Sequence, residues 1–243
     1  VLLEKVKKYV DTNKKAQIVT LNTELLVASE SNKKLSQVIN AAEVVIPESS
    51  GLYLADNYLA SKNSNRFVNL VRSGFVTLKG ERNSLPERLS GVDLCYDLAA
   101  MASEFGYKLV LLGSKDGVAK KAEANLKQIF PNLKVKGIYG GRLGVDDSEI
   151  LRQVQKENVD ILFVAFGQPR QEFWIAENLK KLNVKVAVGV GGTLDFMAGE
   201  VSRAPRLVRN LGLEWGYRLI LQPWRLKRQT ALLRFMSYLW RLG

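Results

Sequence analysis

Apolar residues along the chain fall into two alternating patterns, which predict strands and helices in turn. Short runs rich in Val, Ile and Leu, such as 107–113 and 160–167, are typical of strands covered on both faces. Between them lie segments whose apolar positions repeat at helical spacing. The predicted strands are 16–22, 41–47, 107–113, 133–140, 160–167 and 184–192, and the predicted helices are 2–10, 24–40, 87–106, 118–130, 146–159 and 168–183. This alternation predicts an α/β fold with a Rossmann-like, doubly wound and mainly parallel sheet.

One stretch does not follow this alternation. Residues 48–51 (ESSG) form a predicted loop after the second strand. From 57 to 84, the polar segments SKNSNR and KGERNS flank the apolar FVNLVRSGFVTL, for which we expect a loop or a small β excursion.

Residues 201–243 differ in composition from everything before them. They contain nine Arg and Lys residues and a single acid, Glu214, and so carry eight of the chain's twelve net positive charges. Three of the four tryptophans also lie here, among aliphatic residues at roughly helical spacing. Such a segment is typical of binding to an anionic surface. We therefore expect a Rossmann-like catalytic domain over 1–200 and a basic amphipathic appendage over 201–243; the alternative is a pair of ordinary C-terminal helices.

Composition excludes several classes of function. The 243 residues contain no histidine and one cysteine, Cys95, which excludes histidine-based metal sites, a histidine general base and an internal disulfide. Neither a GxGxxG nor a Walker A sequence is present, so NAD(P) and P-loop ATPase functions have no support. The net charge of +12 would suit nucleic acid, but none of the usual nucleic-acid-binding modules is visible.

The sequence also favours a cytoplasmic location. No apolar run approaches the ~18 residues of a membrane-spanning helix. The N-terminal stretch lacks the apolar segment of a secretory signal, and a single cysteine is typical of a reducing compartment.

Three predicted strands end in glycine-containing turns, 111–117 (LLGSKDG), 166–172 (FGQPRQE) and 190–195 (VGGTLD). Doubly wound sheets bind ligands beyond the carboxyl ends of their strands, near helix N-termini. Three such turns on one rim predict a site for a nucleotide or phosphate group. The alternative is that they only close strand-to-helix connections, with Gln171 and Glu172 capping a helix. The candidate binding residues are Gly113, Ser114, Gly167, Gln168, Gly191, Gly192 and Asp195.

A further candidate site lies where the first two predicted strands end. Glu48 follows the second strand, and Thr20 and Asn22 lie at the end of the first. Parallel strands present their carboxyl ends on the same side, so we expect these side chains to meet at one edge. A carboxylate at this edge could take a proton from a sugar hydroxyl. Alternatively, Glu48 is an ordinary loop residue.

Taken together, these pieces resemble the WecG/TagA/CpsF family of bacterial glycosyltransferases, glycosyltransferase family 26. The stretches that carry the resemblance are IVTLNTELL (18–26), VVIPESSG (44–51), LPERLSGVDL (85–94), LLGSKDGVAKKA (111–122), DILFVAFGQPRQEFWI (160–175), GVGGTLDFMAGEVSRAPR (189–206) and LGLEWGYRLILQPWR (211–225).

The resemblance implies an inverting transferase that needs neither a metal nor another cofactor. It would move an N-acetylmannosamine-type sugar, or in some branches glucose, from a UDP donor to a polyprenyl-diphosphate-linked sugar at the cytoplasmic face of the membrane. By this resemblance the carboxylate base falls on Glu48, in a pocket lined by Thr20 and Asn22. Further polar residues of the active site fall on Arg88 and Gln171. The family's C-terminal arginines fall on Arg218, Arg225 and Arg228, whose guanidinium groups would stabilise the UDP leaving group.

The sequence departs from the family pattern in places. The family usually has Asp followed by Gly where this chain has Glu48 and Ser49, and 138–143 lacks an expected histidine. The first departure favours the alternative that the chain is a peripheral-membrane or polyanion-binding protein of the same fold without transferase activity. A nucleic-acid-binding Rossmann protein is a weaker alternative. The oligomeric state stays open, with a homo-oligomer among the alternatives.

Overall fold

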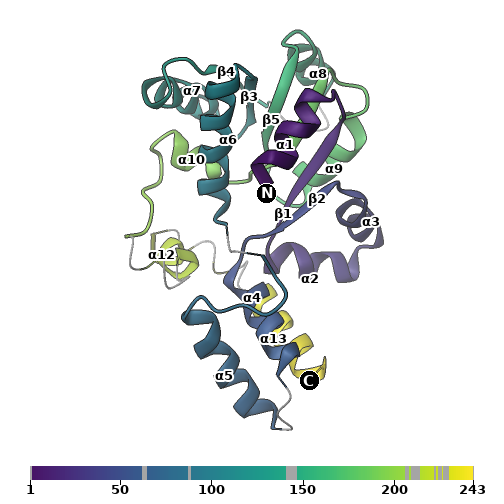
Figure 1. Cartoon of the computed structure of the whole chain (residues 1–243), viewed down its shortest axis with the longest axis vertical. Coiled ribbons are helices and arrows are strands. Elements are labelled where there is room, and N and C mark those ends of the chain that lie inside the picture. Colours follow the sequence, from purple (N-terminus) through teal and green to yellow (C-terminus); the bar gives the residue numbers. More distant parts are fainter. Residues whose placement is uncertain are drawn as a thin grey trace. The chain divides into compact units, whose positions relative to one another are not determined.

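The computed structural model describes residues 2–61, 65–86, 89–140, 147–205, 208, 214–221, 223, 226 and 230–242, and for Trp215 and Arg218 the backbone alone. The elements follow one another in the order α1 (Leu2–Asp11), β1 (Ala16–Leu21), α2 (Thr23–Ser31), α3 (Lys33–Ala41), β2 (Val44–Pro47), α4 (Ser50–Ala60), α5 (Arg66–Leu78), α6 (Gly91–Phe105), β3 (Lys108–Gly113), α7 (Val118–Ile129), β4 (Lys134–Ile138), α8 (Asp147–Gln155), β5 (Val159–Ala165), α9 (Arg170–Asn178), β6 (Val184–Gly189), α10 (Thr193–Met197), α12 (Glu214–Leu221) and α13 (Thr230–Leu242) (Figure 1).

Within the described residues, six strands form a single sheet in the order β2-β1-β6-β5-β3-β4. The pairings of β1 with β6, β6 with β5, β5 with β3 and β3 with β4 are all parallel. Each predicted strand is present, with bounds that differ from the expected ones by a few residues. The predicted doubly wound α/β fold is thereby confirmed.

The sheet is covered on both faces, as its continuous apolar strands require. Along β5, Ile161 and Phe163 belong to one hydrophobic cluster, which includes residues of α1, α6, α7 and α10. Leu162 and Val164 belong to a second cluster with residues of α8 and α9. This alternation follows from the two-residue period of a strand. The core is therefore two layers of side chains, one on each face of the sheet.

By its internal contacts the chain divides into two compact units. Unit 1 contains Val1–Thr20, Lys34–Ile46 and Gly91–Ser202; unit 2 contains Leu21–Lys33, Pro47–Ser90 and Arg203–Gly243. Residues from Arg203 onward thus group with two earlier segments of the chain, and the expected division into a catalytic domain and an appendage at residue 200 stays a prediction.

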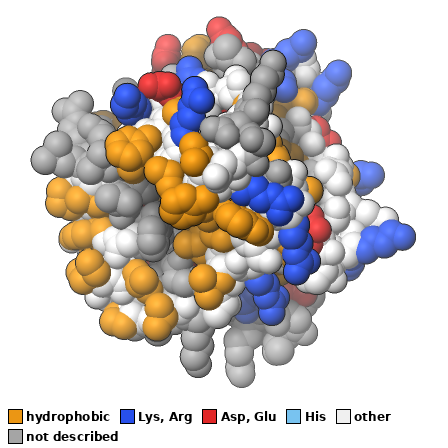
Figure 2. Space-filling view, turned by 90° about the horizontal axis from the view of Figure 1, so that it is seen from below, with side chains coloured by type: hydrophobic (Ala, Val, Ile, Leu, Met, Phe, Trp, Pro, Cys, Tyr) orange, Lys and Arg blue, Asp and Glu red, His pale blue; other side chains and the backbone are white. Residues whose placement is uncertain are grey.

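Unit 2 has its own small core, formed by α2, α4 and α13. The buried residues at its centre include Leu52 of α4 and Phe235 and Leu239 of α13. Several large apolar residues of this unit are exposed, among them Phe67, Phe75, Leu233 and Leu242. Figure 2 shows hydrophobic side chains gathered on the face that it views. Unit 2 therefore exposes a large apolar surface beside a modest core.

Two sequence predictions are wrong in this region. The helix expected over 24–40 is two helices, separated at Asn32, whose backbone is extended. Ser29, Ser31 and Asn32 are weak helix formers because their side chains compete for backbone hydrogen bonds, which accounts for the break.

The loop or β excursion expected over 57–84 is also wrong, since α4 and α5 occupy most of it. The polar segment SKNSNR contains a helix cap: the Asn65 side chain accepts hydrogen bonds from the N–H groups of Phe67 and Val68, at 3.0 and 3.2 Å. The expected loop 48–51 is likewise shorter, because α4 already begins at Ser50.

Candidate functional site

The carboxyl ends of β3 and β5 form a switch point in unit 1. From β3 the chain passes through α7 to β4 on one side, and from β5 it passes through α9 to β6 on the other. Residues of α7 pack in the first cluster and those of α9 in the second, so the two connections leave on opposite faces of the sheet. Doubly wound sheets bind their ligands at such a point. The turns after β3 and β5 therefore lie where a ligand site is expected.

Backbone geometry at this point requires glycine. Gly113 has a φ of 103°, and a Cβ atom there would lie 2.9 Å from the Phe166 ring and 3.0 Å from the Ala165 carbonyl oxygen. The next residue, Ser114, donates its N–H to the same oxygen over 2.9 Å. Its hydroxyl donates to Oδ1 of Asp195, 2.8 Å away. The turn after β3 is thus tied both to β5 and to α10, and the hydroxyl–carboxylate pair is only partly buried.

A chain of hydrogen bonds joins the ends of β1 and β6 to the start of α9. The Thr20 hydroxyl donates to the Gly189 carbonyl over 2.9 Å, and the Gln168 side-chain amide donates to the Thr20 carbonyl over 3.1 Å. The Gly191 N–H donates to Oε1 of Gln171 over 3.0 Å. Gln171 is completely buried, so its amide fixes the turn that leads through Gly192 into α10. Its predicted part in a reaction stays a prediction.

Sequence reasoning placed Glu172 in the candidate turn 166–172, either as part of a binding site or as a helix cap, but did not predict its burial. Its side chain is completely buried, and Oε1 accepts a hydrogen bond from the Gln171 amide over 2.9 Å. Burial raises the pKa of the Glu172 carboxyl to about 7, an effect that the bond from Gln171 only partly opposes. Room for this pair comes from Gly189, where a Cβ atom would lie 2.7 Å from Gln171 Nε2 and 3.1 Å from Glu172 Oε1. No feature of the sequence alone marks Glu172 as buried.

In unit 2, Asn22 and Glu48 lie at the ends of strands β1 and β2. The side-chain oxygen of Asn22 accepts the N–H of Leu25 over 2.9 Å and so caps α2. The N–H of Glu48 donates to the Leu21 carbonyl over 2.8 Å, which joins the two strand ends. The Glu48 side chain is partly buried, directly before the start of α4. Because helix N-termini favour negative charge, this is a suitable place for a carboxylate.

Ser49 strengthens the same junction. Its Oγ accepts the N–H of Thr23 over 3.1 Å and lies 2.7 Å from the Thr23 hydroxyl. A Cβ atom at Gly51 would come within 2.5 Å of that hydroxyl, so the starts of α2 and α4 pack closely. Leu21 therefore holds Glu48 through its backbone N–H, and Thr23 holds the next residue, Ser49, through its side chain.

The structure thus places the predicted residues in separate groups. Ser114 pairs with Asp195, and Thr20 is linked to Gln168, all in unit 1. Asn22 and Glu48 belong to unit 2, so the expected meeting of Thr20 with these two residues stays a prediction. Arg88, Arg225, Arg228 and the side chain of Arg218 lie outside the described residues.

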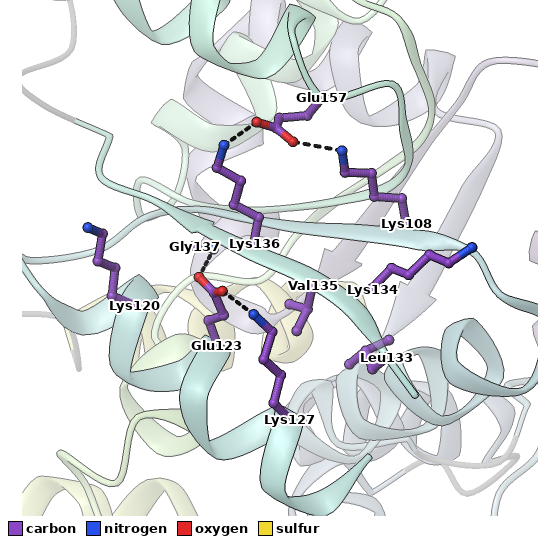
Figure 3. A pocket seen from close by; sticks show the side chains of 10 residues that line it. All are labelled: Lys108, Lys120, Glu123, Lys127, Leu133, Lys134, Val135, Lys136, Gly137 and Glu157. Atoms are coloured by element: carbon purple, nitrogen blue, oxygen red, sulfur yellow. Dashed lines mark hydrogen bonds and ion pairs between the residues drawn. The ribbon is translucent and has the colours of Figure 1, made fainter. Parts of the chain in front are cut away.

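A hollow of about 530 Å³ lies elsewhere in unit 1, beside the edge strand β4. Its rim is basic, but Glu157 pairs with Lys108 and Lys136, and Glu123 pairs with Lys127 (Figure 3). The residues that line it are Lys108, Lys120, Glu123, Lys127, Leu133, Lys134, Val135, Lys136, Gly137 and Glu157. Lys108 and Lys134 begin their strands and Glu157 precedes β5, so the hollow extends toward the amino ends of the strands, away from the switch point.

Two further observations concern the described residues only. Among them, no three Cys, Asp or Glu side chains gather closely enough to hold a metal ion. None of the helices in the described part of the chain combines the length and the apolar character needed to cross a membrane.

Comparison with known proteins gives one matching family and a similar curated protein, and both are glycosyltransferases. Residues 1–70 and 75–242 match the family described as "Glycosyl transferase WecG/TagA/CpsF family". The chain is also 30% identical, over 230 residues, to the N-acetylglucosaminyldiphosphoundecaprenol N-acetyl-beta-D-mannosaminyltransferase of Bacillus subtilis (strain 168). That alignment covers 94% of this chain and 80% of the relative.

Proposed function

This chain belongs to the WecG/TagA/CpsF family of glycosyltransferases, and from that premise we propose that it transfers an N-acetylmannosamine-type sugar from UDP to a polyprenyl-diphosphate-linked N-acetylglucosamine. The relative from Bacillus subtilis carries a mannosaminyltransferase name that specifies a diphosphoundecaprenol acceptor, which supports this choice of acceptor. The Ser114–Asp195 pair at the switch point supports a nucleotide donor, because its partly buried hydroxyl and carboxylate are suited to bind ribose hydroxyls.

The proposed reaction is a single displacement. The acceptor hydroxyl oxygen attacks C1 of the donor sugar as the bond from C1 to the UDP oxygen breaks, and UDP leaves with the electron pair. The hydroxyl proton passes to the carboxylate of Glu48, which acts as general base. One displacement at C1 inverts its configuration.

The leaving UDP needs positive charge, since it gains a negative charge as the bond breaks. We propose that Arg218, Arg225 and Arg228 provide it, with Arg88 as a further polar residue of the site and no metal ion. Guanidinium groups bind phosphate oxygens in pairs and are suited to this role. Because the acceptor is lipid-linked, we place the reaction at the cytoplasmic surface of the bacterial membrane.

Release of UDP tests the proposal directly. Purified protein should release UDP from UDP-N-acetylmannosamine only when a short-chain lipid-diphosphate N-acetylglucosamine is present, and at the same rate in EDTA. Absence of acceptor-dependent release from both UDP-N-acetylmannosamine and UDP-glucose would refute the transferase proposal. Loss of activity in EDTA that Mg²⁺ restores would refute metal independence alone.

Asp195→Ala is expected to weaken UDP binding about tenfold, which corresponds to roughly 1.4 kcal/mol, because one charged acceptor is lost. Ser114→Ala should have a smaller effect, and the double variant should lose less than the two effects combined, since the residues share a hydrogen bond. Isothermal titration with UDP measures both. The matched control is Asp116→Ala, which removes an exposed carboxylate from the turn that contains Ser114. Equal UDP affinity in wild type and Asp195→Ala would exclude this role.

A further inference from the structure

Helix α5 in unit 2 buries two polar side chains and exposes several large apolar ones. Asn69 and Ser73 are buried, with 4% and 2% of their surface exposed. Phe67 and Phe75 are 66% and 65% exposed. A helix on the surface of a globular protein normally has the opposite arrangement. The orientation of α5 thus needs a specific explanation.

Hydrogen bonds to neighbouring residues fix the polar side of α5. The Ser61 hydroxyl donates to Oδ1 of Asn69 over 2.6 Å. The Asn57 side-chain amide of α4 donates to the Thr77 hydroxyl over 3.1 Å, and the Thr77 hydroxyl donates to the Ser73 carbonyl over 2.7 Å. Turning the helix to bury its phenylalanines would break the bonds to Ser61 and Asn57. The apolar side is therefore held outward by the fold of unit 2.

The outward residues form one stripe. Phe67, Val71, Phe75 and Leu78 are all exposed and follow one another at intervals of four, four and three residues, which is helical spacing. Val68 is exposed beside them. We call these five residues the α5 stripe.

Charge around the α5 stripe is positive. From Asn57 to Gly80 the sequence contains Lys62, Arg66, Arg72 and Lys79 and no acidic residue. The last three are exposed. Figure 2 shows Lys and Arg side chains bordering the hydrophobic surface in this view. An apolar stripe with basic neighbours is complementary to a bilayer whose headgroups are anionic.

Helix α13, which packs against the same α4, has similar exposed residues. Leu233, Trp240 and Leu242 are exposed, as are Arg234 and Arg241. Residues 230–242 contain no acid. Two helices of unit 2, α5 and α13, thus combine exposed apolar residues with exposed basic ones.

We propose that the α5 stripe inserts into the surface of an anionic lipid bilayer, with α5 lying in the plane of the headgroups. A helix of this length spans about 20 Å, which suits an interfacial orientation without crossing the membrane. This proposal rests on the proposed function in one respect. The proposed acceptor is anchored in the bilayer by its lipid, so an enzyme that uses it must work at the bilayer surface.

Flotation with vesicles tests the proposal. Wild-type protein should float with vesicles of phosphatidylglycerol and phosphatidylcholine, and the double variant Phe67→Ser, Phe75→Ser should bind at least about tenfold more weakly. The matched control is Phe105→Ser, Ile129→Ser, which removes two exposed apolar side chains from unit 1 and should leave vesicle binding unchanged. Arg66→Glu, Arg72→Glu should weaken binding to anionic vesicles by a similar factor.

Three results would overturn the proposal. One is equal flotation of wild type and the phenylalanine variant, both shown to be folded by circular dichroism. Another is no flotation of the wild type. The third is a lipid-free wild-type dimer that the same variant converts to monomer in sedimentation, which would make the stripe a contact between copies of this chain.

Transfer to a short-chain, water-soluble acceptor in lipid-free buffer separates this proposal from the proposed function. The phenylalanine variant should keep wild-type transfer there, since the stripe serves only membrane binding. If the wild type floats through α5 but transfers no sugar, the proposed function fails and the bilayer contact stands. If the variant loses transfer without lipid, the stripe has another role and the bilayer proposal fails.

Discussion

Glu48→Gln is expected to lower the rate of sugar transfer by about three orders of magnitude and to leave UDP affinity unchanged. The amide has nearly the shape of the carboxylate but cannot accept the acceptor's proton. The hydrogen bond from the Glu48 N–H to the Leu21 carbonyl does not involve the side chain, so this variant keeps it. Single-turnover transfer and UDP titration measure the two quantities.

Two companion variants sharpen this test. Glu30→Gln removes an exposed carboxylate at the end of α2, in the same unit, and should keep wild-type activity. Glu48→Asp keeps the carboxylate but shortens its side chain by one methylene, so an intermediate loss is expected because the geometry of proton transfer changes. Near wild-type turnover of Glu48→Gln would exclude Glu48 as the base.

Glu172→Gln is expected to change how stability depends on pH. Because the pKa of Glu172 is raised to about 7 in the folded protein, the folded state binds its proton more tightly than the unfolded state. This stabilisation is complete below pH ~4.5 and is lost as the pH rises through about 7, amounting to roughly 3 kcal/mol. The glutamine variant is neutral throughout. Its free energy of unfolding relative to wild type should therefore increase by roughly 3 kcal/mol between pH 4 and 8.5.

Urea denaturation of both proteins at the two pH values measures this difference. Glu177→Gln is the control, since Glu177 is on the same helix and forms an exposed ion pair with Lys34. Its removal should change stability by no more than about 1 kcal/mol. Parallel pH profiles for wild type and Glu172→Gln would show that Glu172 does not titrate in the folded protein near neutrality.

The sheet could be predicted from the sequence because its strands are nearly continuous apolar runs. Residues 160–167 are almost all apolar, which predicts a strand covered on both faces, and Phe163 near the centre of this run is fully buried. The prediction was wrong at α5 for a physical reason: several of its apolar residues, among them Phe67 and Phe75, have helical spacing but are exposed. A pattern that assumes burial of apolar residues cannot identify a helix whose buried residues are Asn69 and Ser73.

At the candidate site, the glycines that follow strands allowed the positions of the turns to be predicted. The turns at Gly113 and Gly167 were predicted from their position after strands, and both glycines have positive φ values. The pairing of Ser114 with Asp195 could not be predicted, because 81 residues separate them. Nor could the burial of Glu172, since it depends on the space left by Gly189, which lies on another strand. The sequence thus predicted which turns lie at the carboxyl edge of the sheet, but not which side chains pair or become buried there.

The charged side chains around the hollow beside β4 lead to an expectation about aggregation. β4 is an edge strand, and the N–H groups of such a strand can recruit a strand from another molecule. One of them is already occupied, because the Gly137 N–H donates to Oε2 of Glu123 over 2.7 Å. Lys134 and Lys136 place charges along the same edge. Glu123→Ala should therefore increase β-type self-association at high protein concentration, which light scattering would measure.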